Sequence, residues 1–255
     1  MSDSRLPLIE LNGSRYEYED VGGGFASAPL LFLHEGLGSV GLWRGFHRRI
    51  AAASGRRAVA YSRLGHGFSD LPPSKRTPSF MHEEAAQVVS SLMAALDLPE
   101  PVLVGHSDGA SIALLVAAAL PVRGLVVMAP HVFVESHGLD GIVAARTAYL
   151  EGDLRTRMAR HHRDPDVTFW NWNDVWLDPR FRDWDITAEL AGIRCPVLGV
   201  QGDADRYGSM AHVEAVRDRA GGPVELLALS CGHSPHLECP EATEKVVTEF
   251  LRSLG

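Results

Sequence analysis

The sequence predicts an α/β protein with a mostly parallel central sheet, helices on both faces and one inserted helical segment. Short apolar runs alternate with longer helical stretches along most of the chain. The runs are apolar on both faces, which is typical of strands buried between two helical layers. The alternation stops once, between residues 131 and 194, where no run resembles a strand. With 255 residues, the chain has room for one large α/β domain or two small ones.

The elements follow in a regular order. Residues 8–22 alternate apolar and polar side chains around Asn12-Gly13, which predicts an antiparallel hairpin at the edge of the sheet. The predicted strands that follow are 29–35, 57–63, 101–107, 124–130, 195–202 and 224–230. The predicted helices are 40–53, 80–97, 109–120, 209–220 and 240–254. This alternation implies parallel pairing through right-handed crossovers.

The interruption divides the chain into a core, residues 1–130 and 195–255, and an insertion, residues 131–194. The insertion holds four of the five tryptophans of the chain. Their rings either fix the insertion to the core or wall an apolar substrate pocket, and both can hold together. We expect Trp170 and Trp176 to line that pocket.

Composition excludes several classes of partner. The net charge is −8 and no long run of Lys or Arg occurs, so a nucleic acid is not expected as partner. No secretory signal is visible, and the longest apolar stretch, residues 110–122, is too short to span a bilayer. Cys195, Cys231 and Cys239 are expected to be free thiols, and the cytoplasm is the expected location. The sequence leaves the oligomeric state open.

No metal or cofactor is expected. The chain has no glycine loop typical of phosphate binding. Several histidines in predicted helices and loops lack acidic or histidine partners at the spacing of metal ligands. They are His47, His66, His82, His161, His162 and His212.

The segment Gly105-His106-Ser107-Asp108-Gly109 lies where a buried strand should turn into a helix. A nucleophile held on so sharp a turn needs small neighbours, and glycines two positions before and after it relieve the crowding. Ser107 would then lie at a helix N-terminus, where free N–H groups favour developing negative charge. The segment predicts Ser107 as a nucleophile.

A serine hydroxyl needs a base, and the base needs an orienting group. The residues after strand 195–202 offer Asp203 and Asp205, and those after strand 224–230 offer His233 and His236. Both pairs follow Ser107, in the order serine, acid, histidine that an α/β hydrolase shows.

From LLFLHEGLGS to the C-terminal helix, the chain resembles the α/β-hydrolase superfamily. The resemblance implies the α/β-hydrolase fold, with residues 131–194 as a helical cap. The family's Gly-x-x-Asp pattern selects Asp205 over Asp203 as the acid. Its Gly-His-x-x-x-x-Glu-x-Pro pattern selects His233 as the base. His236 is then expected at the surface or against the cap.

LHEGLGS resembles the family's His-Gly-x-x-Gly loop, which implies that the N–H groups of Gly36 and Asp108 hold the oxyanion. Glu35 departs from the family's glycine and brings a carboxylate to the site, either solvated or paired with a histidine or arginine. The Asp108 side chain either complements the helix dipole or pairs with a cationic group on the substrate. SRLGHGFSD resembles the family's Asp-x-Arg-Gly-x-Gly-x-Ser, with Ser62 and Leu64 replacing Asp and Arg, and is interpreted as scaffold.

The resemblance implies hydrolysis of a carboxylic ester, thioester or lactone of a small apolar molecule through an acyl-enzyme on Ser107. A C–C bond hydrolase, a cofactor-free perhydrolase or haloperoxidase and an acyltransferase use the same residues and stay open. A haloalkane dehalogenase or epoxide hydrolase does not fit, because these need a carboxylate at the position of Ser107. The alternative outside enzymes is a small-molecule receptor on the same fold, which the complete set of three residues disfavours.

Overall fold

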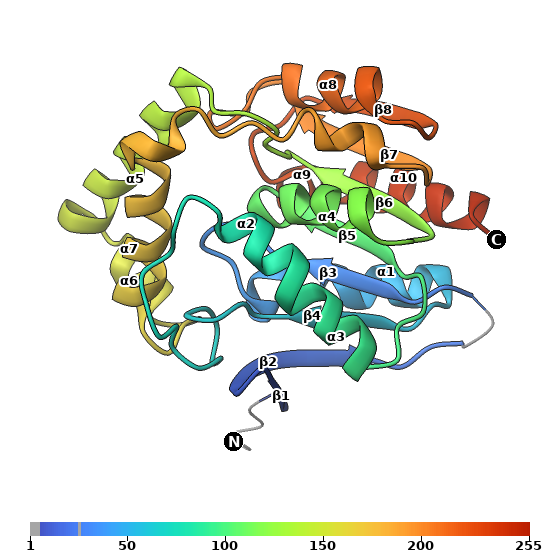
Figure 1. Ribbon diagram of the computed structural model, residues 1–255, viewed down its shortest axis with the longest axis horizontal. Helices are drawn as coiled ribbons and strands as arrows, with labels where there is room; N and C mark the ends of the chain where they lie inside the picture. The colour runs from blue at the N-terminus through green and yellow to red at the C-terminus, as the bar shows by residue number, and fades with distance from the viewer. Residues whose placement is uncertain (1–5, 25–26) are drawn as a thin grey trace.

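The computed structural model describes residues 6–24 and 27–255. Residues 1–5 and 25–26 of the predicted core lie outside this description. In the described part of the chain, eight strands form one sheet in the order β1-β2-β4-β3-β5-β6-β7-β8 (Figure 1). The strands are β1 (Leu8–Leu11), β2 (Ser14–Val21), β3 (Leu30–Leu33), β4 (Ala58–Tyr61), β5 (Val102–His106), β6 (Gly124–Met128), β7 (Val197–Gly202) and β8 (Val224–Leu229).

Pairing within the sheet follows the sequence prediction. β3 to β8 run parallel, and the β1–β2 hairpin joins the edge antiparallel to β4. Asn12 and Gly13 both have positive φ, 52° and 78°, as the tight turn of a right-twisted hairpin requires. The hairpin and the six predicted parallel strands are confirmed.

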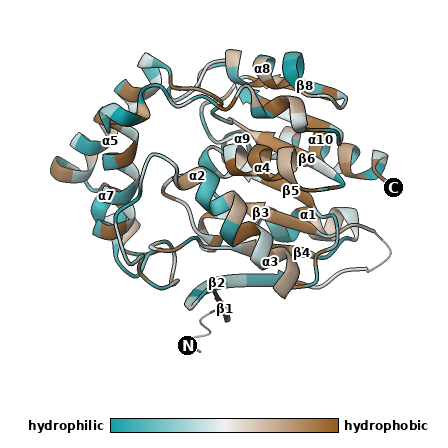
Figure 2. Ribbon diagram, viewed as in Figure 1, coloured by the Kyte–Doolittle hydropathy of each residue, from teal (hydrophilic) through white to brown (hydrophobic). Residues whose placement is uncertain are grey.

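Helices cover the two faces of the sheet. Successive residues of β3 point to opposite faces, because Leu30 and Phe32 belong to one hydrophobic cluster and Leu31 and Leu33 to the other. One face packs against α1 (Phe46–Ser54) and α10 (Pro240–Ser253). The other face packs against α2 (Phe80–Glu83), η2 (Glu84–Val89), α3 (Ser90–Ala95) and α4 (Asp108–Ala119). Hydrophobic residues are concentrated in these central strands and in α4 (Figure 2).

The predicted helix 80–97 contains a π-helical turn, η2, between α2 and α3. A π turn widens a helix by one residue, which sequence periodicity does not reveal. Its first residue, Glu84, accepts a hydrogen bond of 2.8 Å from the Tyr61 hydroxyl at the end of β4. The remaining helices of the core are η1 (Val40–Trp43), α8 (Ala211–Arg219) and α9 (Pro235–Glu238).

Residues 131–194 carry the helices α5 (Ser136–Glu151), α6 (Leu154–Met158), α7 (Pro165–Trp176), η3 (Pro179–Phe181) and η4 (Glu189–Gly192). Figure 1 shows α5, α6 and α7 together beyond one end of the sheet. Asp164 caps the N-terminus of α7, because its side chain accepts hydrogen bonds of 3.0 Å from the N–H groups of Asp166 and Val167. Unlike α5, α6 and α7, η4 packs on α4. The two helices are so close that a Cβ on Gly192 would lie 2.6 Å from the Ala118 carbonyl oxygen.

Cys195, Cys231 and Cys239 are free thiols, as predicted. Among residues 6–24 and 27–255, no helix combines the length and the apolar character needed to cross a membrane.

Candidate active site

Ser107 occupies a strained turn between β5 and α4. Its φ of 54° and ψ of −123° are unusual for a residue with a side chain. The neighbouring glycines are required by close packing: a Cβ on Gly105 would lie 2.5 Å from the Ala110 Cα, and one on Gly109 would lie 2.0 Å from the Leu33 carbonyl oxygen. The turn therefore brings Ser107 to the carboxyl edge of the sheet at the start of α4.

Ser107, His233 and Asp205 form a hydrogen-bonded row. The Ser107 Oγ lies 2.9 Å from the His233 Nε2, and the His233 Nδ1 lies 2.8 Å from the Asp205 Oδ2. The structure thus brings the expected nucleophile, base and acid into contact. Asp203 points elsewhere, since it is exposed and accepts a hydrogen bond of 3.1 Å from the Ser230 hydroxyl.

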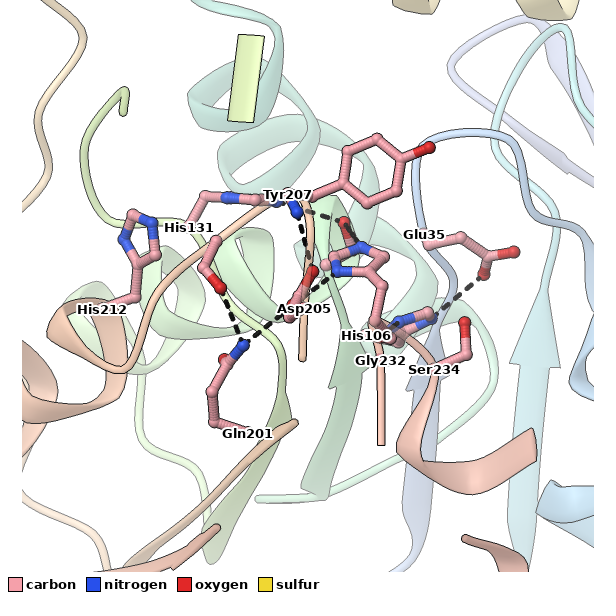
Figure 3. A network of polar contacts seen from close by, with 12 residues as sticks. Glu35, His106, His131, Gln201, Asp205, Tyr207, His212, Gly232 and Ser234 are labelled. Atoms are coloured by element: carbon pink, nitrogen blue, oxygen red, sulfur yellow. Dashed lines mark hydrogen bonds and ion pairs between the residues drawn. The ribbon is translucent and has the colours of Figure 1, made fainter. Parts of the chain in front are cut away.

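The Asp205 carboxylate is held as an anion. Its Oδ2 also accepts a bond of 2.8 Å from the Gln201 amide, and its Oδ1 accepts one of 2.8 Å from the Tyr207 N–H (Figure 3). Burial acts to raise the pKa of Asp205. The hydrogen bond and charge of His233, with the bonds from Tyr207 and Gln201, outweigh burial and lower this pKa to about 2. Asp205 is therefore ionised at any pH where a histidine base could work.

A cavity of about 100 Å³ lies directly over Ser107. Its walls are mostly apolar; the acidic residues Glu35 and Asp108 are among the described residues that line it, and no lysine or arginine is. The lining residues are Glu35, Gly36, Leu37, Ser107, Asp108, His131, Gly138, Ile142, Trp172, Trp176, Tyr207 and His233.

Two of the three tryptophans of α7 line the cavity, and the third lies on another face of the helix. Trp176 lines the cavity, as expected, and so does Trp172. The prediction for Trp170 is wrong: its ring packs at 5.1 Å from that of Phe169 and under the Arg146 guanidinium. Residues four apart share a helix face, whereas residues two apart point in nearly opposite directions. Helical spacing from Trp176 would have selected Trp172.

Glu35 meets a histidine. Its Oε2 lies 3.5 Å from the His106 Nδ1, and the His106 Nε2 donates a bond of 2.8 Å to the His233 carbonyl oxygen. Figure 3 shows Glu35 and His106 facing each other. Burial acts to raise the pKa of Glu35, but His106, and more weakly His236, lower it to about 2. The pair joins the loop after β3 to the turns that carry Ser107 and His233.

His236 lies inside the core layer, which corrects the expectation of a surface or cap contact. It is 2% exposed, and its ring packs against Trp43 and Phe46 on the face covered by α1. Burial lowers its pKa to about 3. The helix α9, which carries His236, turns the side chain towards Trp43 and Phe46, a placement that local sequence does not determine.

The backbone N–H groups expected to hold an oxyanion are available. Gly36 and Asp108 both line the cavity, and neither N–H bonds to an acceptor within the described residues. Gly36 must be glycine, because a Cβ there would lie 2.1 Å from the Trp172 Nε1. The buried Arg63 holds this loop, donating bonds of 2.6 Å and 2.8 Å to the His34 and Glu35 carbonyl oxygens.

The Asp108 side chain is buried, with 1% of its surface exposed. Its Oδ1 accepts a bond of 3.2 Å from the Trp176 indole, and its Oδ2 has no partner among the described residues. Burial raises the pKa of Asp108, against the opposing charges of Arg63 and Arg76. The Asp108 side chain is therefore not a solvated carboxylate that only complements the helix dipole.

The segment 62–70, interpreted as scaffold, bonds to neighbouring segments of the core. Ser62 accepts a bond of 3.0 Å from the Val40 N–H and donates one of 2.7 Å to the Glu17 carboxylate. Across the described ranges, no three or more His, Cys, Asp or Glu side chains are grouped to hold a metal ion.

Sequence reasoning missed His131. Its Nε2 lies 3.4 Å from the Ser107 Oγ, on a ring that also lines the cavity. His131 follows strand β6 at the carboxyl edge of the sheet, as Asp205 follows β7 and His233 follows β8. Position after a parallel strand was the signal that could have found it.

Comparison with known proteins identifies the family. Residues 30–246 match the model of the alpha/beta hydrolase family. The chain belongs to that family. It is a hydrolase with the α/β-hydrolase fold.

Individual relatives are distant. The chain is 27% identical to the dihydrolipoyllysine-residue acetyltransferase component of the acetoin cleaving system of Pseudomonas putida, over 90% of this chain and 65% of that protein's length. It is 24% identical to the serine hydrolase BPHL of Mus musculus, over 96% of this chain and 85% of that protein.

Solved structures share the fold. An enol-lactonase from Burkholderia xenovorans superposes with a TM-score of 0.75 at 19% identity, covering 96% of this chain and 100% of that one. An esterase from Exiguobacterium antarcticum superposes with a TM-score of 0.73 at 19% identity, covering 97% and 99%.

Proposed function

We propose that the chain hydrolyses small carboxylic esters, thioesters or lactones through an acyl-enzyme on Ser107. The observation that carries the proposal is the row Ser107–His233–Asp205, with contacts of 2.9 Å and 2.8 Å, opening into a cavity. The relatives named serine hydrolase and the structures named esterase and lactonase support it.

In this mechanism the His233 Nε2 takes the hydroxyl proton as the Ser107 Oγ attacks the carbonyl carbon. The N–H groups of Gly36 and Asp108 stabilise the negative charge on the carbonyl oxygen. His233 then passes its proton to the leaving alcohol. Asp205 keeps the Nδ1 hydrogen in place and stabilises the imidazolium that forms between these steps. Water, activated by His233, releases the acid.

The cavity limits the size of the substrate. A cavity of about 100 Å³ is small. It fits a short acyl group. Residues 131–194 would act as the cap that sets this limit, because Trp172 and Trp176 of α7 and Ile142 of α5 form part of the wall.

Charge limits the substrate class. A substrate bearing a carboxylate, such as a product of aromatic ring cleavage, would face Glu35 and Asp108 without a lysine or arginine in the described lining. This disfavours the C–C bond hydrolase and favours uncharged or cationic esters. The three free thiols fit a reducing compartment such as the cytoplasm.

The test is turnover of p-nitrophenyl esters of graded acyl length. We expect acetate and propionate to react fastest, with kcat/KM falling at least tenfold by hexanoate. Ser107→Ala should lower turnover by about 10⁴- to 10⁶-fold. Activity of that variant within tenfold of wild type, or no activity of wild type on any ester, would refute the proposal. Adding hydrogen peroxide or an alcohol tests whether the acyl group goes preferentially to these acceptors, as a perhydrolase or acyltransferase would require.

A further inference from the structure

The mechanism above leaves one histidine beside the nucleophile without a role. His131 is 5% exposed, lines the cavity, and places its Nε2 3.4 Å from the Ser107 Oγ. It lies apart from His233, since the centroids of the two rings are 5.9 Å apart. The Ser107 Oγ therefore has two imidazole neighbours.

The hydrogens of this group can be assigned. The His233 Nδ1–H donates a hydrogen bond to Asp205, so the His233 Nε2 is free to accept one from the Ser107 hydroxyl. This bond, at 2.9 Å, is shorter than the 3.4 Å contact between the Ser107 Oγ and His131. The Ser107 Oγ then offers only lone pairs to His131. Their contact is favourable if the His131 Nε2 carries a hydrogen and donates it. Burial lowers the pKa of His131 well below its usual value, so the ring is neutral and has one hydrogen to place.

The surroundings hold this ring in place. The His131 N–H donates a bond of 3.0 Å to the Ser111 Oγ, which donates one of 2.6 Å to the His131 carbonyl oxygen. The edge of Trp176 packs on one side, with ring centroids 5.0 Å apart. His212 packs on another side at 5.3 Å, and its Nε2 lies 3.0 Å from the Glu135 carboxylate. A donor fixed before the reaction costs no reorganisation during it.

We propose that His131 is a second catalytic histidine, which stabilises the Ser107 Oγ as the leaving group when the acyl-enzyme is hydrolysed. This inference rests on the proposed function. Water adds to the acyl carbon and gives a proton to the His233 Nε2. The bond between the acyl carbon and the Oγ then breaks, its electron pair goes to the Oγ, and His233 returns the proton there. His131 keeps its own hydrogen and only donates a hydrogen bond.

The contribution differs between the two halves of the reaction. Before acylation, the Oγ is a hydroxyl oxygen, which already accepts the His131 hydrogen bond well. In the acyl-enzyme it is an ester single-bond oxygen, a poor acceptor, and it becomes a strong acceptor as the bond to carbon breaks. Only an interaction that strengthens between ground state and transition state accelerates a step. His131 should therefore accelerate deacylation more than acylation.

The test compares His131→Asn and His131→Gln with wild type by stopped-flow kinetics on p-nitrophenyl acetate. Glutamine can place an N–H near the position of the imidazole Nε2, whereas asparagine is too short. In the asparagine variant we expect deacylation to slow about 10- to 100-fold. The burst should approach one p-nitrophenol per active site, with kcat/KM within about threefold of wild type. The glutamine variant should recover most of the lost deacylation rate.

His47→Gln is the matched control, because His47 is a buried histidine of α1 whose Nε2 bonds to Glu19 of β2, so the change should leave both rates unchanged. A parallel fall in kcat and kcat/KM in both His131 variants would show a structural role and overturn the inference. Unchanged deacylation in both would also overturn it. Failure of wild type to hydrolyse any ester would instead refute the proposed function, and the role of His131 with it.

Discussion

Replacing Asp205 by Asn should nearly abolish turnover, although the two side chains have almost the same shape. Both carboxylate oxygens accept hydrogen bonds: the Oδ1 from the Tyr207 N–H, and the Oδ2 from His233 and Gln201. An asparagine turned one way sets its amide N–H₂ against the Tyr207 donor. Turned the other way, it donates to the His233 Nδ1 and moves the imidazole hydrogen to the Nε2, which then cannot accept the Ser107 proton.

In either orientation the charge that stabilises the His233 imidazolium is lost. The equivalent change in another serine–histidine–aspartate triad costs about 10⁴-fold in kcat, or about 5.4 kcal/mol at 1.36 kcal/mol per tenfold. Steady-state turnover of p-nitrophenyl acetate measures the loss, with thermal unfolding as the check on folding. Asp203→Asn is the control and should stay within about threefold, because the Asp203 side chain is exposed and, among the described residues, bonds only to the Ser230 hydroxyl. If the Asp203 variant is inactive and the Asp205 variant active, the assignment of the acid is refuted.

Further predictions concern the walls of the cavity. Trp172→Ala should enlarge the cavity and raise kcat/KM for hexanoate relative to acetate at least tenfold. Trp170 lies outside the cavity, so Trp170→Ala should leave this ratio unchanged. Equal effects of the two variants on the ratio would contradict the placement of α7. The Asp108 Oδ2 is buried without a partner among the described residues, so it could pair with a cationic group of the substrate. Asp108→Asn should then lower kcat/KM about 10- to 100-fold for an α-amino ester and much less for its analogue without the amino group. Equal changes in kcat/KM for the two esters would exclude charge recognition. Glu35 has its pKa lowered from 4.5 to about 2, so its contribution to stability is present above pH 4.5 and is lost as the pH falls towards 2. Glu35→Gln should therefore lower the free energy of unfolding by about 1–3 kcal/mol at neutral pH. This is less than the free energy equivalent to the whole pKa shift, because the side chain is partly exposed. Near pH 2 the same change should have almost no effect on the free energy of unfolding. Urea denaturation at several pH values measures this, and a loss independent of pH would contradict a stabilising contact between the Glu35 carboxylate and His106.

The parts of the fold that were predictable depend on local chemistry. β3 and β5 are apolar on both faces because helices cover both, and the sequence shows this directly. Asn12-Gly13 specifies its own turn, and Gly105 and Gly109 specify the crowding around Ser107. The π turn η2 was not predictable, because its 6 residues are too few to show a period different from that of an α-helix.

The parts of the site that were not predictable depend on contacts between distant segments. Glu35 gains its partner only because β3 and β5 are neighbours in the sheet, which brings His106 beside it. His236 enters the core because α9 turns it towards Trp43. Trp172 and His131 carried usable signals, one in helical spacing and the other in its position after a strand.

The central claim is that Ser107 is a nucleophile activated by His233. The most direct test is the intact mass of the protein after reaction with a fluorophosphonate, which forms a stable bond with an activated serine. We expect one adduct per chain on wild type, assigned to Ser107 by peptide mapping, none on Ser107→Ala, and a much slower reaction on His233→Ala. An adduct on another residue, or equal labelling of the Ser107→Ala variant, would contradict it.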